Sequence, residues 1–226
     1  MVDLVSMSGE NFIKTVYKFE IREGGDTKPG SIARELGITN AAATDMARKL
    51  AIKKLIDYKK YREVKLTPAG EKVALGVVRK HRLWETFLHH VLGLTMHEIH
   101  REAELLEHLT SDFLAEKISQ FLGNPATDPH GDPIPDINGN ISNDKSGVVL
   151  SAAEPEKEFK ISRLSGSDKE FFDFCYSNHL TVGSELTVKK QYQKNRMTEI
   201  EISNVKLLLH AELANSIYVN ELYQNK

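Results

Sequence analysis

Residues 31–50 read SIARELGITNAAATDMARKL, and this stretch decides the fold of the N-terminal part of the chain. Its first residues form a short helical pattern that ends at Gly37, a residue type that readily takes the left-handed conformation found after helix ends. Thr39 or Asn40 then caps a second helix that runs to about Lys54. Two helices joined by such a tight turn predict a helix-turn-helix with the second helix as the recognition helix.

The sequence on either side of this motif predicts a winged helix. Residues 10–22 carry apolar and aromatic side chains at the spacing of an amphipathic helix. Residues 55–58 and 64–66 are apolar or alternate around a polar tip, which predicts the two strands of a hairpin. The next helix begins near Pro68, because proline is tolerated in a first turn.

Charge is distributed unevenly along the chain. The net charge of the 226 residues is −2, but residues 1–80 hold 16 Lys and Arg against 10 Asp and Glu, a balance of +6. The remaining 14 basic and 22 acidic residues give residues 81–226 a balance of −8. The basic N-terminal part favours nucleic-acid binding, since only the contacting face must be positive. Charge alone leaves a solvated charged face as the alternative.

Two long helical patterns follow the hairpin. The first covers residues 71–91, and a capping box at Thr95 and Glu98 opens a second that is expected to reach Phe121. Residues 123–140 contain four prolines with several Asn, Asp and Gly, a composition that cannot sustain a helix or a central strand. These residues are therefore expected to form a linker.

The C-terminal part has the alternation of a small β-barrel. Turn residues separate strand-like runs at residues 159–161, 185–189, 197–202, 206–209 and 216–219. We therefore expect a multidomain chain that is mainly α with a small β domain. Its expected domains are a winged helix-turn-helix over residues 1–70, a helical domain over 71–140 that includes the linker 123–140, and a β-barrel over 141–226.

Composition narrows the functional classes. The hydrophobic fraction of 40% and charged fraction of 27% are ordinary for a soluble protein, and no stretch approaches the roughly 20 apolar residues of a membrane helix. The N-terminus lacks a basic region followed by an apolar run, so a cytoplasmic protein without membrane contact is expected. Cys175 is the only cysteine, which excludes a thiolate-rich zinc site. Metal ligands in this chain would be nitrogen and oxygen atoms.

Two histidine–carboxylate clusters lie on the long helical patterns. They read His81-x-x-x-Glu85 and His100-x-x-x-Glu104-x-x-Glu107-His108. Residues three and four apart share a helix face, so Glu104, Glu107 and His108 can converge on one point. His100 lies one turn earlier. A cluster of this composition needs a cation.

These motifs together resemble a known family. They are Arg79-Lys-His-Arg-Leu83 with Glu85, the cluster His100–His108, Asp128-Pro-His-Gly-Asp-Pro-Ile-Pro135 and Val182-Gly-Ser-Glu185. The chain resembles the DtxR/MntR family of metal-dependent transcriptional regulators over nearly its whole length. The resemblance implies a homodimer with a winged helix, a helical dimerisation domain that bears the metal sites, and an SH3-like (FeoA-type) C-terminal domain.

The resemblance implies a primary metal site that gates DNA binding. Its ligands would be Glu104, Glu107 and His108, with Asn11 from the first helix. Iron-type members place methionine and cysteine at the positions of Asn11 and Glu104, whereas manganese-type members place aspartate and glutamate. Oxygen donors favour Mn²⁺, with Fe²⁺ as the alternative, and Zn²⁺ could occupy either site in a crystal because it binds more tightly. Glu10 is expected to point about 100° away around the helix.

The resemblance also implies an ancillary metal site. Its ligands would be His81, Glu85 and His100. The remaining ligands would come either from the barrel, at Asp168, or from the linker, at Asp128 and His130. The two sets share Glu85 and are alternatives.

Operator DNA is the expected partner of the winged helix. Base contacts are expected from Thr39, Asn40, Ala41, Thr44 and Asp45, and phosphate contacts from Arg48, Lys49, Lys59, Lys60 and Arg62. Family members often have proline or serine near Asn40 and Ala41, so readout here would rest largely on DNA shape and thymine methyl groups. A two-fold dimer would bind an inverted repeat with half-sites about one DNA turn apart, or tandem dimers would bind a longer operator.

Two other functional classes fit less well. A metal-dependent hydrolase lacks support because the chain has no His-Glu-x-x-His motif and no general base outside the ligand set. A metal buffer or an accessory subunit of metal transport would leave the winged helix without a role. The sequence therefore predicts a metal-dependent transcriptional repressor of metal-homeostasis genes, not an enzyme.

Overall fold

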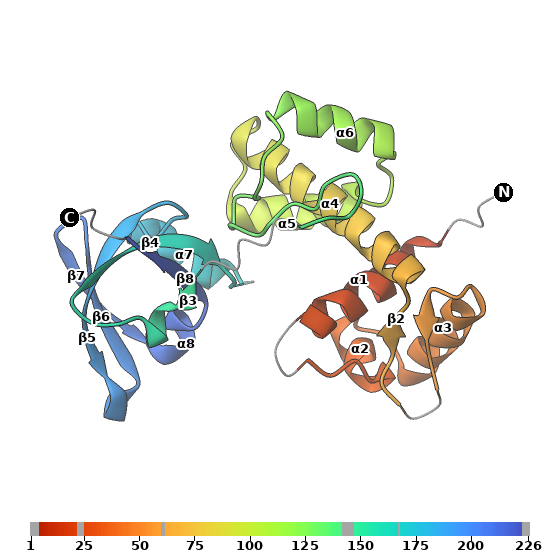
Figure 1. Cartoon of the computed structure of the whole chain (residues 1–226), viewed down its shortest axis with the longest axis horizontal. Coiled ribbons are helices and arrows are strands. Elements are labelled where there is room, and N and C mark those ends of the chain that lie inside the picture. The colour runs from red at the N-terminus through yellow and green to blue at the C-terminus, as the bar shows by residue number, and fades with distance from the viewer. Residues whose placement is uncertain (1–4, 22–24, 60–61, 142–146, 167, 223–226) are drawn as a thin grey trace. The chain divides into compact units, whose positions relative to one another are not determined.

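The computed structural model describes residues 5–21, 25–59, 62–141, 147–166 and 168–222 (Figure 1). The chain divides into two compact units. The first contains residues 1–84, 103–123 and 134–141, and the second contains residues 85–102, 124–133 and 142–226. The architecture is the predicted one, mainly helical with a small β domain.

A winged helix-turn-helix begins the first unit, as predicted. Its elements are α1 (Met7–Ile21), α2 (Pro29–Glu35), α3 (Asn40–Ile52), β1 (Ile56–Asp57) and β2 (Lys65–Leu66). Phe12, Ile13 and Val16 of α1 are fully buried in one cluster with Ala43 and Ala47 of α3. The apolar stripe of the first helix is therefore its core-facing side.

Local chemistry explains the turn between α2 and α3. Gly37 has a φ of 63°, a conformation that glycine adopts without steric cost. The Oγ1 of Thr39 caps α3 by accepting a hydrogen bond of 3.2 Å from the N–H of Ala42. The helix boundaries expected from these two residues are confirmed.

The β1–β2 hairpin is short and antiparallel, with Ile56 opposite Leu66. Helix α4 (Pro68–His90) begins directly against it. A Cβ atom at Gly70 would lie 1.9 Å from the carbonyl oxygen of Leu55, so only glycine permits this close approach. Lys60, an expected phosphate contact at the tip of the wing, lies outside the described residues.

Helix α4 and helix α5 (Met96–Leu106) contribute residues to both units. The predicted capping box opens α5: the N–H of Thr95 donates to Glu98 Oε2 over 2.9 Å, and the N–H of Glu98 donates to Thr95 Oγ1 over 3.4 Å. The capping box is therefore confirmed.

The expectation of one continuous helix from this cap to Phe121 is wrong. The chain leaves the helix after Leu106 and starts a new one, α6 (Asp112–Phe121). The hydroxyl of Thr110 donates to the carbonyl of Leu106, and Ser111 Oγ accepts the N–H of Leu114 as the cap of α6. Adjacent hydroxyl side chains compete for backbone hydrogen bonds and favour helix ends over helix interiors.

The second unit is built on one antiparallel sheet with the strand order β3-β8-β4-β5-β6-β7. The strands are β3 (Val148–Val149), β4 (Lys157–Leu164), β5 (Glu185–Tyr192), β6 (Met197–Ile202), β7 (Val205–His210) and β8 (Ile217–Glu221), with helices α7 (Lys169–Ser177) and α8 (Ala211–Ala214) and 3₁₀ turns at Leu150–Ala152 and Gln193–Asn195. The five expected strands correspond to β4 to β8. The sequence prediction missed β3, α7 and α8.

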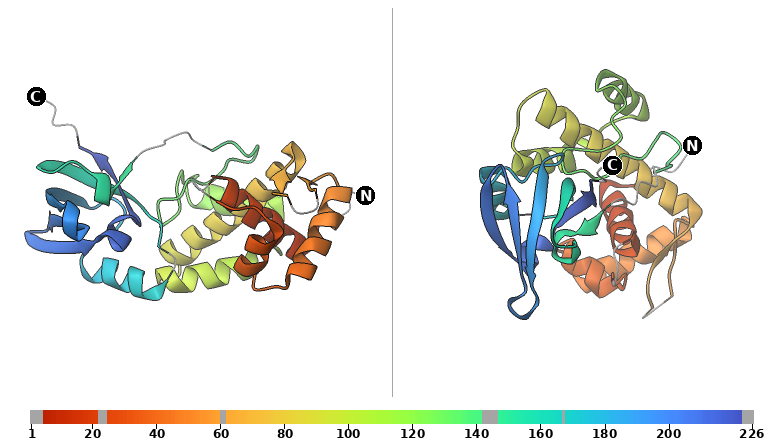
Figure 2. Two further views of the ribbon diagram at one scale, coloured as in Figure 1. Left: turned by 90° about the horizontal axis from the view of Figure 1, so that it is seen from below. Right: turned by 60° about the vertical axis from the view of Figure 1, so that its left-hand side comes forward.

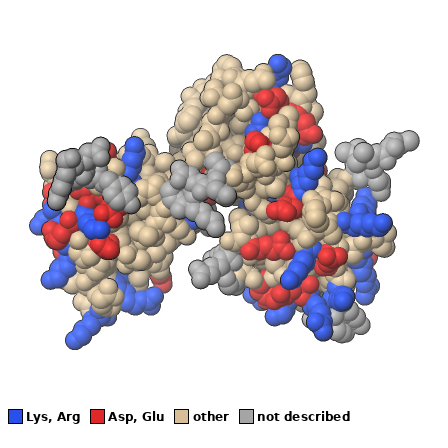
Figure 3. All heavy atoms as spheres, in the orientation of Figure 1, with Lys and Arg blue, Asp and Glu red and all other residues tan. Residues whose placement is uncertain are grey.

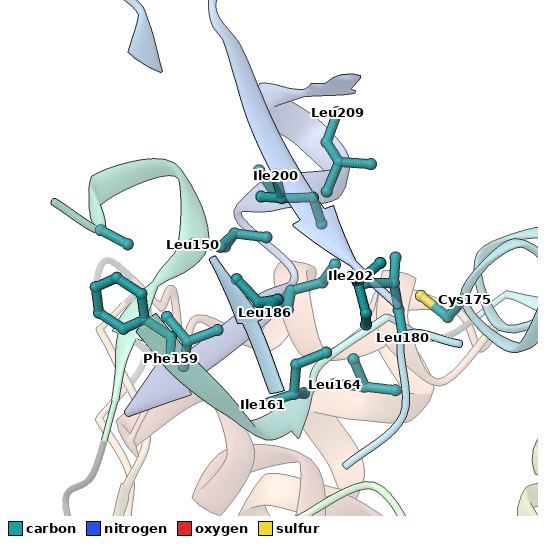
Figure 4. Close-up of a cluster of buried hydrophobic side chains, with 14 of the residues drawn as sticks. Leu150, Phe159, Ile161, Leu164, Cys175, Leu180, Leu186, Ile200, Ile202 and Leu209 are labelled. Atoms are coloured by element: carbon teal, nitrogen blue, oxygen red, sulfur yellow. The ribbon is translucent and has the colours of Figure 1, made fainter. Parts of the chain in front are cut away.

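The sheet is strongly curved (Figure 2), and buried apolar side chains from its strands and from α7 form one core. Buried side chains alternate along β6, where Thr198, Ile200 and Ile202 point inward. Leu186 and Ile161 meet them from neighbouring strands, and Cys175 reaches the same core from helix α7 (Figure 4). The lone cysteine is thus a core residue.

The first part of the linker is fastened to the sheet within the second unit. The carbonyl of His130 accepts the N–H of Leu164 over 2.8 Å. Gly131 has a φ of 88°, and a Cβ atom there would lie 2.1 Å from the carbonyl oxygen of Ser162. The linker is irregular, as predicted, but it has a defined conformation. None of the described helices is long and apolar enough to cross a membrane.

Candidate metal centre

Charged side chains from α1 and α5 meet inside the first unit. The Lys14 ammonium lies 2.8 Å from Glu104 Oε1 and 2.6 Å from Glu107 Oε1. Lys14 is 4% exposed and Glu107 is 1% exposed. Glu104 lies in the last turn of α5, and Glu107 lies in the turn that follows. We call the set of Glu10, Asn11, Lys14, His81, Glu104, Glu107 and His108 the primary cluster.

Helix α4 contributes His81 to this cluster. Its Nδ1 lies 2.6 Å from Glu107 Oε2 and 3.9 Å from Glu104 Oε1. The three residues each offer one ligand atom, and these atoms lie within 4.8 Å of one another. His81, expected in the ancillary site, belongs to the first unit, whereas Glu85 and His100 belong to the second.

His108 connects the cluster to the first helix through both ring nitrogens. Nε2 lies 2.8 Å from Asn11 Oδ1 and 3.2 Å from Glu107 Oε1. Nδ1 lies 2.6 Å from Glu10 Oε2. A carboxylate at this distance from one ring nitrogen can orient the ring, as carboxylates orient metal-bound histidines.

The sequence prediction overlooked Glu10 and Lys14. Glu10 was expected to point away from the site, but its long side chain reaches the far side of the His108 ring. Lys14 follows Glu10 by four residues and Asn11 by three, so all three share one face of α1. That spacing, together with a lysine on an otherwise buried helix face, was the available signal.

Two opposing effects act on the pKa of Glu104. Burial raises it, but the charge of Lys14 and the hydrogen bond from its ammonium lower it more, with smaller contributions from His81 and Lys18. The net pKa is below the ordinary value, so this carboxylate is ionised at neutral pH and available as an oxygen ligand.

A second cluster, formed by Glu85, Asp128 and His130, lies within the second unit. All three residues are buried, and their ligand atoms lie within 4.8 Å of one another. His130 Nδ1 is 3.8 Å from both Glu85 Oε2 and Asp128 Oδ1. Backbone N–H groups of His130 and Asp132 donate to Asp128 Oδ1 and fix that carboxylate. The exposed ring of His100 lies 3.1 Å from Glu85 Oε1.

Asp168, the expected ligand from the barrel, has a different environment. Its Oδ1 accepts the N–H of Phe171 over 2.8 Å and caps helix α7. Among the described residues, the groups with three candidate ligands do not include it. Of the two alternatives for completing the second site, the linker residues Asp128 and His130 are the ones that lie beside Glu85.

The donors of both clusters fit a hard or borderline divalent ion. They are carboxylate and amide oxygens and imidazole nitrogens, the types that bind Mn²⁺ and Fe²⁺. The one thiol, Cys175, is buried in the sheet core, where desolvation raises its pKa to about 12. Both groups could therefore hold a cation through nitrogen and oxygen alone.

The winged helix presents a basic and polar surface. Thr39, Asn40, Ala41, Asp45, Arg48, Lys49, Lys59 and Arg62 are exposed, and Thr44 is half-buried. Lys and Arg side chains gather around α3 and the hairpin (Figure 3). Asp45 and Lys49 form an ion pair of 2.8 Å one turn apart on α3, so part of this surface is internally neutralised.

Several exposed large apolar side chains lie on the last turn of α5, on the turn after it and on α6. The exposed large side chains there are Leu105, Leu109, Phe113, Leu114 and Phe121. Leu109 is 80% exposed and Phe113 is 73% exposed. Such a concentration of exposed apolar groups is typical of a protein–protein interface.

Three family models match consecutive parts of the chain. The N-terminal DNA binding domain of iron dependent repressors matches residues 4–64. Their metal binding and dimerisation domain matches residues 67–136, and the FeoA domain matches residues 148–221.

Characterised regulators are similar in sequence. The diphtheria toxin repressor of Corynebacterium glutamicum is 32% identical over 118 residues, which are 52% of this chain and 51% of that protein. The match thus spans about half the length of that relative. The HTH-type transcriptional regulator MntR of Geobacillus kaustophilus is 35% identical over 101 residues, 45% of this chain and 70% of that protein.

Solved structures are similar over most of the chain. A manganese-dependent transcriptional repressor in complex with manganese matches with a TM-score of 0.86 and 31% identity, over 95% of this chain and 100% of that chain. ScaR with bound Cd²⁺ matches with a TM-score of 0.78 and 30% identity, over 95% of this chain and 99% of that chain.

Proposed function

The chain belongs to the iron-dependent (DtxR/MntR) repressor family, and we propose that it is a cytoplasmic transcriptional repressor whose homodimer binds operator DNA when a divalent metal ion is bound. One observation carries the proposal. Helix α1 of the DNA-binding part supplies Asn11 and Glu10 to the ring of His108, beside Glu107. The primary cluster therefore connects the element that positions the recognition helix with the helices that bear the metal ligands.

The residues of this junction explain how a cation would act as a switch. Glu104 and Glu107 place two carboxylates close together between α1 and α5, and the single ammonium of Lys14 that contacts both offsets only part of their negative charge. A bound divalent ion would supply the positive charge that holds these ligands together. Glu10 would keep His108 oriented with Nε2 toward the ligand set. The result is a population shift toward the conformation that fits the operator.

We propose Mn²⁺ as the activating ion and Fe²⁺ as the alternative. Glu104 replaces the cysteine of iron-type relatives, and the donors are oxygen and imidazole nitrogen, which supports a hard or borderline ion. Related structures contain manganese, Cd²⁺ and Zn²⁺, and the greater intrinsic affinity of Zn²⁺ makes crystal occupancy a weak guide to the physiological ion.

We assign a supporting role to the second cluster. Glu85, Asp128 and His130 come from α4 and the linker, and His100 adds a nitrogen from α5. A cation there would fasten the linker to the helices of the same unit. Asp168 stays a proposed ligand that would have to leave its capping position.

The homodimer would place two recognition helices on one operator. The exposed first turns of α3 support base contacts from Thr39, Asn40 and Ala41, and Arg48 and Arg62 are available to phosphates. The apolar surface around Leu109 supports the dimer contact. We propose domain boundaries of 1–70, 71–140 and 141–226 and an inverted-repeat operator upstream of metal-homeostasis genes.

Titration of Mn²⁺ into a gel-shift assay with the protein's own promoter tests the proposal. We expect DNA binding that requires the metal and is reversed by a chelator. Glu104→Ala and His108→Ala should abolish the response to metal and leave the dimer intact. Equal DNA binding with Mn²⁺ and with chelator would refute the proposed function, and an unchanged response in both variants would refute the site.

A further inference from the structure

Lys14 places an ammonium group among the predicted metal ligands, although an ammonium cannot bind a metal ion. The side chain is 5% exposed, and its Nζ lies within 2.8 Å of one oxygen of Glu104 and one of Glu107. A buried ammonium is costly unless it is paired, so these two carboxylates fix its position. The contacts join α1 to the end of α5, the same junction that His108 spans.

The charges of the primary cluster limit how many metal ions it can hold. Glu10, Glu104 and Glu107 contribute three negative charges when ionised, and Lys14 contributes one positive charge. With both imidazoles neutral, as they are when they bind a metal ion, the balance is −2, which one divalent ion neutralises. A second divalent ion would leave a buried charge of +2, and such a charge is strongly unfavourable away from water.

We propose that Lys14 is a built-in cation with two consequences for the proposed metal switch. In the metal-free protein its ammonium pairs with Glu104 and Glu107 and keeps α1 near α5. In the presence of metal it competes for the same carboxylates, which weakens metal affinity and restricts the primary cluster to a single divalent ion. The inference rests on the proposed function, because it assigns a role in metal binding to a residue that is not a ligand.

The test compares the full chain with Lys14→Met and with Lys72→Met, a matched control that removes an exposed lysine of α4 in the same unit. All proteins carry Glu85→Gln and Asp128→Asn, which remove both carboxylates of the second cluster, so that bound ions are counted at the primary cluster. Thermal unfolding is measured in EDTA and in saturating Mn²⁺, and calorimetric titration gives the number and affinity of bound Mn²⁺ ions.

We expect the Lys14→Met protein to melt at a lower temperature than its parent in EDTA, and this difference to shrink in Mn²⁺, because the metal replaces the missing charge. Mn²⁺ should bind Lys14→Met about tenfold or more tightly, since a neighbouring positive charge is gone. The parent should bind one ion, and Lys72→Met should match it throughout.

Five outcomes would overturn the inference. The first is that Lys14→Met lowers the melting temperature equally in EDTA and in Mn²⁺, as the loss of an ordinary structural ion pair would. The second is that Lys14→Met leaves the affinity for Mn²⁺ unchanged. Two ions at the cluster of the parent protein would also do so. If Lys14→Met does not fold, Lys14→Arg keeps the charge and should keep the stability of the parent in EDTA, so a failure there would count against the inference. A parent protein without any response to Mn²⁺ would refute the proposed function as well.

Discussion

Glu104 and Glu107 both contact Lys14, but their surroundings predict very different costs of removal. The Glu107 side chain is fully buried and has close partners on three sides, namely Lys14 at 2.6 Å, His81 at 2.6 Å and His108 at 3.2 Å. The Glu104 side chain is 35% exposed, so water solvates part of the carboxylate that pairs with Lys14 at 2.8 Å. Removing the charge of Glu107 leaves a buried ammonium with a single partially solvated carboxylate.

The perturbation is Glu107→Gln compared with Glu104→Gln in metal-free protein. Breaking a buried ion pair costs about 3–5 kcal/mol, and the amide oxygen of Gln still accepts one hydrogen bond, so about 3 kcal/mol is expected for Glu107→Gln. A partly solvated pair contributes about 1 kcal/mol or less, which is the expectation for Glu104→Gln. At about 2–4 °C per kcal/mol, these values correspond to losses of roughly 6–12 °C and no more than about 4 °C.

Thermal unfolding in EDTA, followed by circular dichroism, measures the difference. Glu35→Gln, at an exposed carboxylate of α2, is the control and should melt with the wild type. If Glu104→Gln costs as much as Glu107→Gln, then the assignment of Glu107 as the buried centre of the cluster is wrong.

Three further predictions concern other parts of the molecule. The double variant Leu109→Glu/Phe113→Glu should weaken the homodimer by at least about 1000-fold, measured by sedimentation. Each subunit loses two apolar side chains from the contact, and burial of each such side chain contributes about 1.5–3 kcal/mol. An unchanged dimer would place the interface elsewhere. Cys175 should not react with thiol reagents at neutral pH until the second unit unfolds, since burial raises its pKa to about 12 and keeps it protonated; rapid labelling of native protein would contradict this. The hydrogen bonds from the backbone and side chain of Thr95 lower the pKa of Glu98, so the contribution of this carboxylate to stability is complete above the ordinary pKa of 4.5 and is lost as the pH falls through the lower folded-state pKa. Glu98→Gln should therefore destabilise the protein at pH 7 and not in strong acid. An equal effect at both pH values would show that the ionised carboxylate is not what stabilises the fold here.

Short-range signals made the winged helix predictable from sequence. Gly37 and Thr39 act on their immediate neighbours, so their residue types alone indicate where one helix ends and the next begins. The break between α5 and α6 was also encoded locally, in Thr110 and Ser111, but the apolar pattern on both sides outweighed it. Helix-period patterns can continue in phase across such a break, so periodicity alone does not detect it.

The composition of the primary cluster was harder to predict, because its members come from three helices. Spacing identified Glu104, Glu107 and His108, which lie close together in the chain. The sequence paired His81 with Glu85 on the same helix, but the contacts of its ring also depend on how α4 packs. In the structure His81 lies beside Glu107, which comes from the turn after α5. Lys14 was not singled out from the sequence, although a lysine on a buried helix face is unusual unless it is paired.

Lys14 also changes how the neutral Asn11 is understood. Asn11 carries an amide where manganese-type relatives place an aspartate, so the ligand set has one negative charge fewer. The ammonium of Lys14 neutralises a second negative charge. Glu10 restores one by facing the opposite side of His108. These three residues lie within about one turn and a half of α1, so this helix adjusts the electrostatic attraction for a divalent ion that Glu104 and Glu107 provide. A substitution on this face of α1 would then shift the metal concentration at which the protein responds without altering Glu104, Glu107 or the surface that contacts DNA.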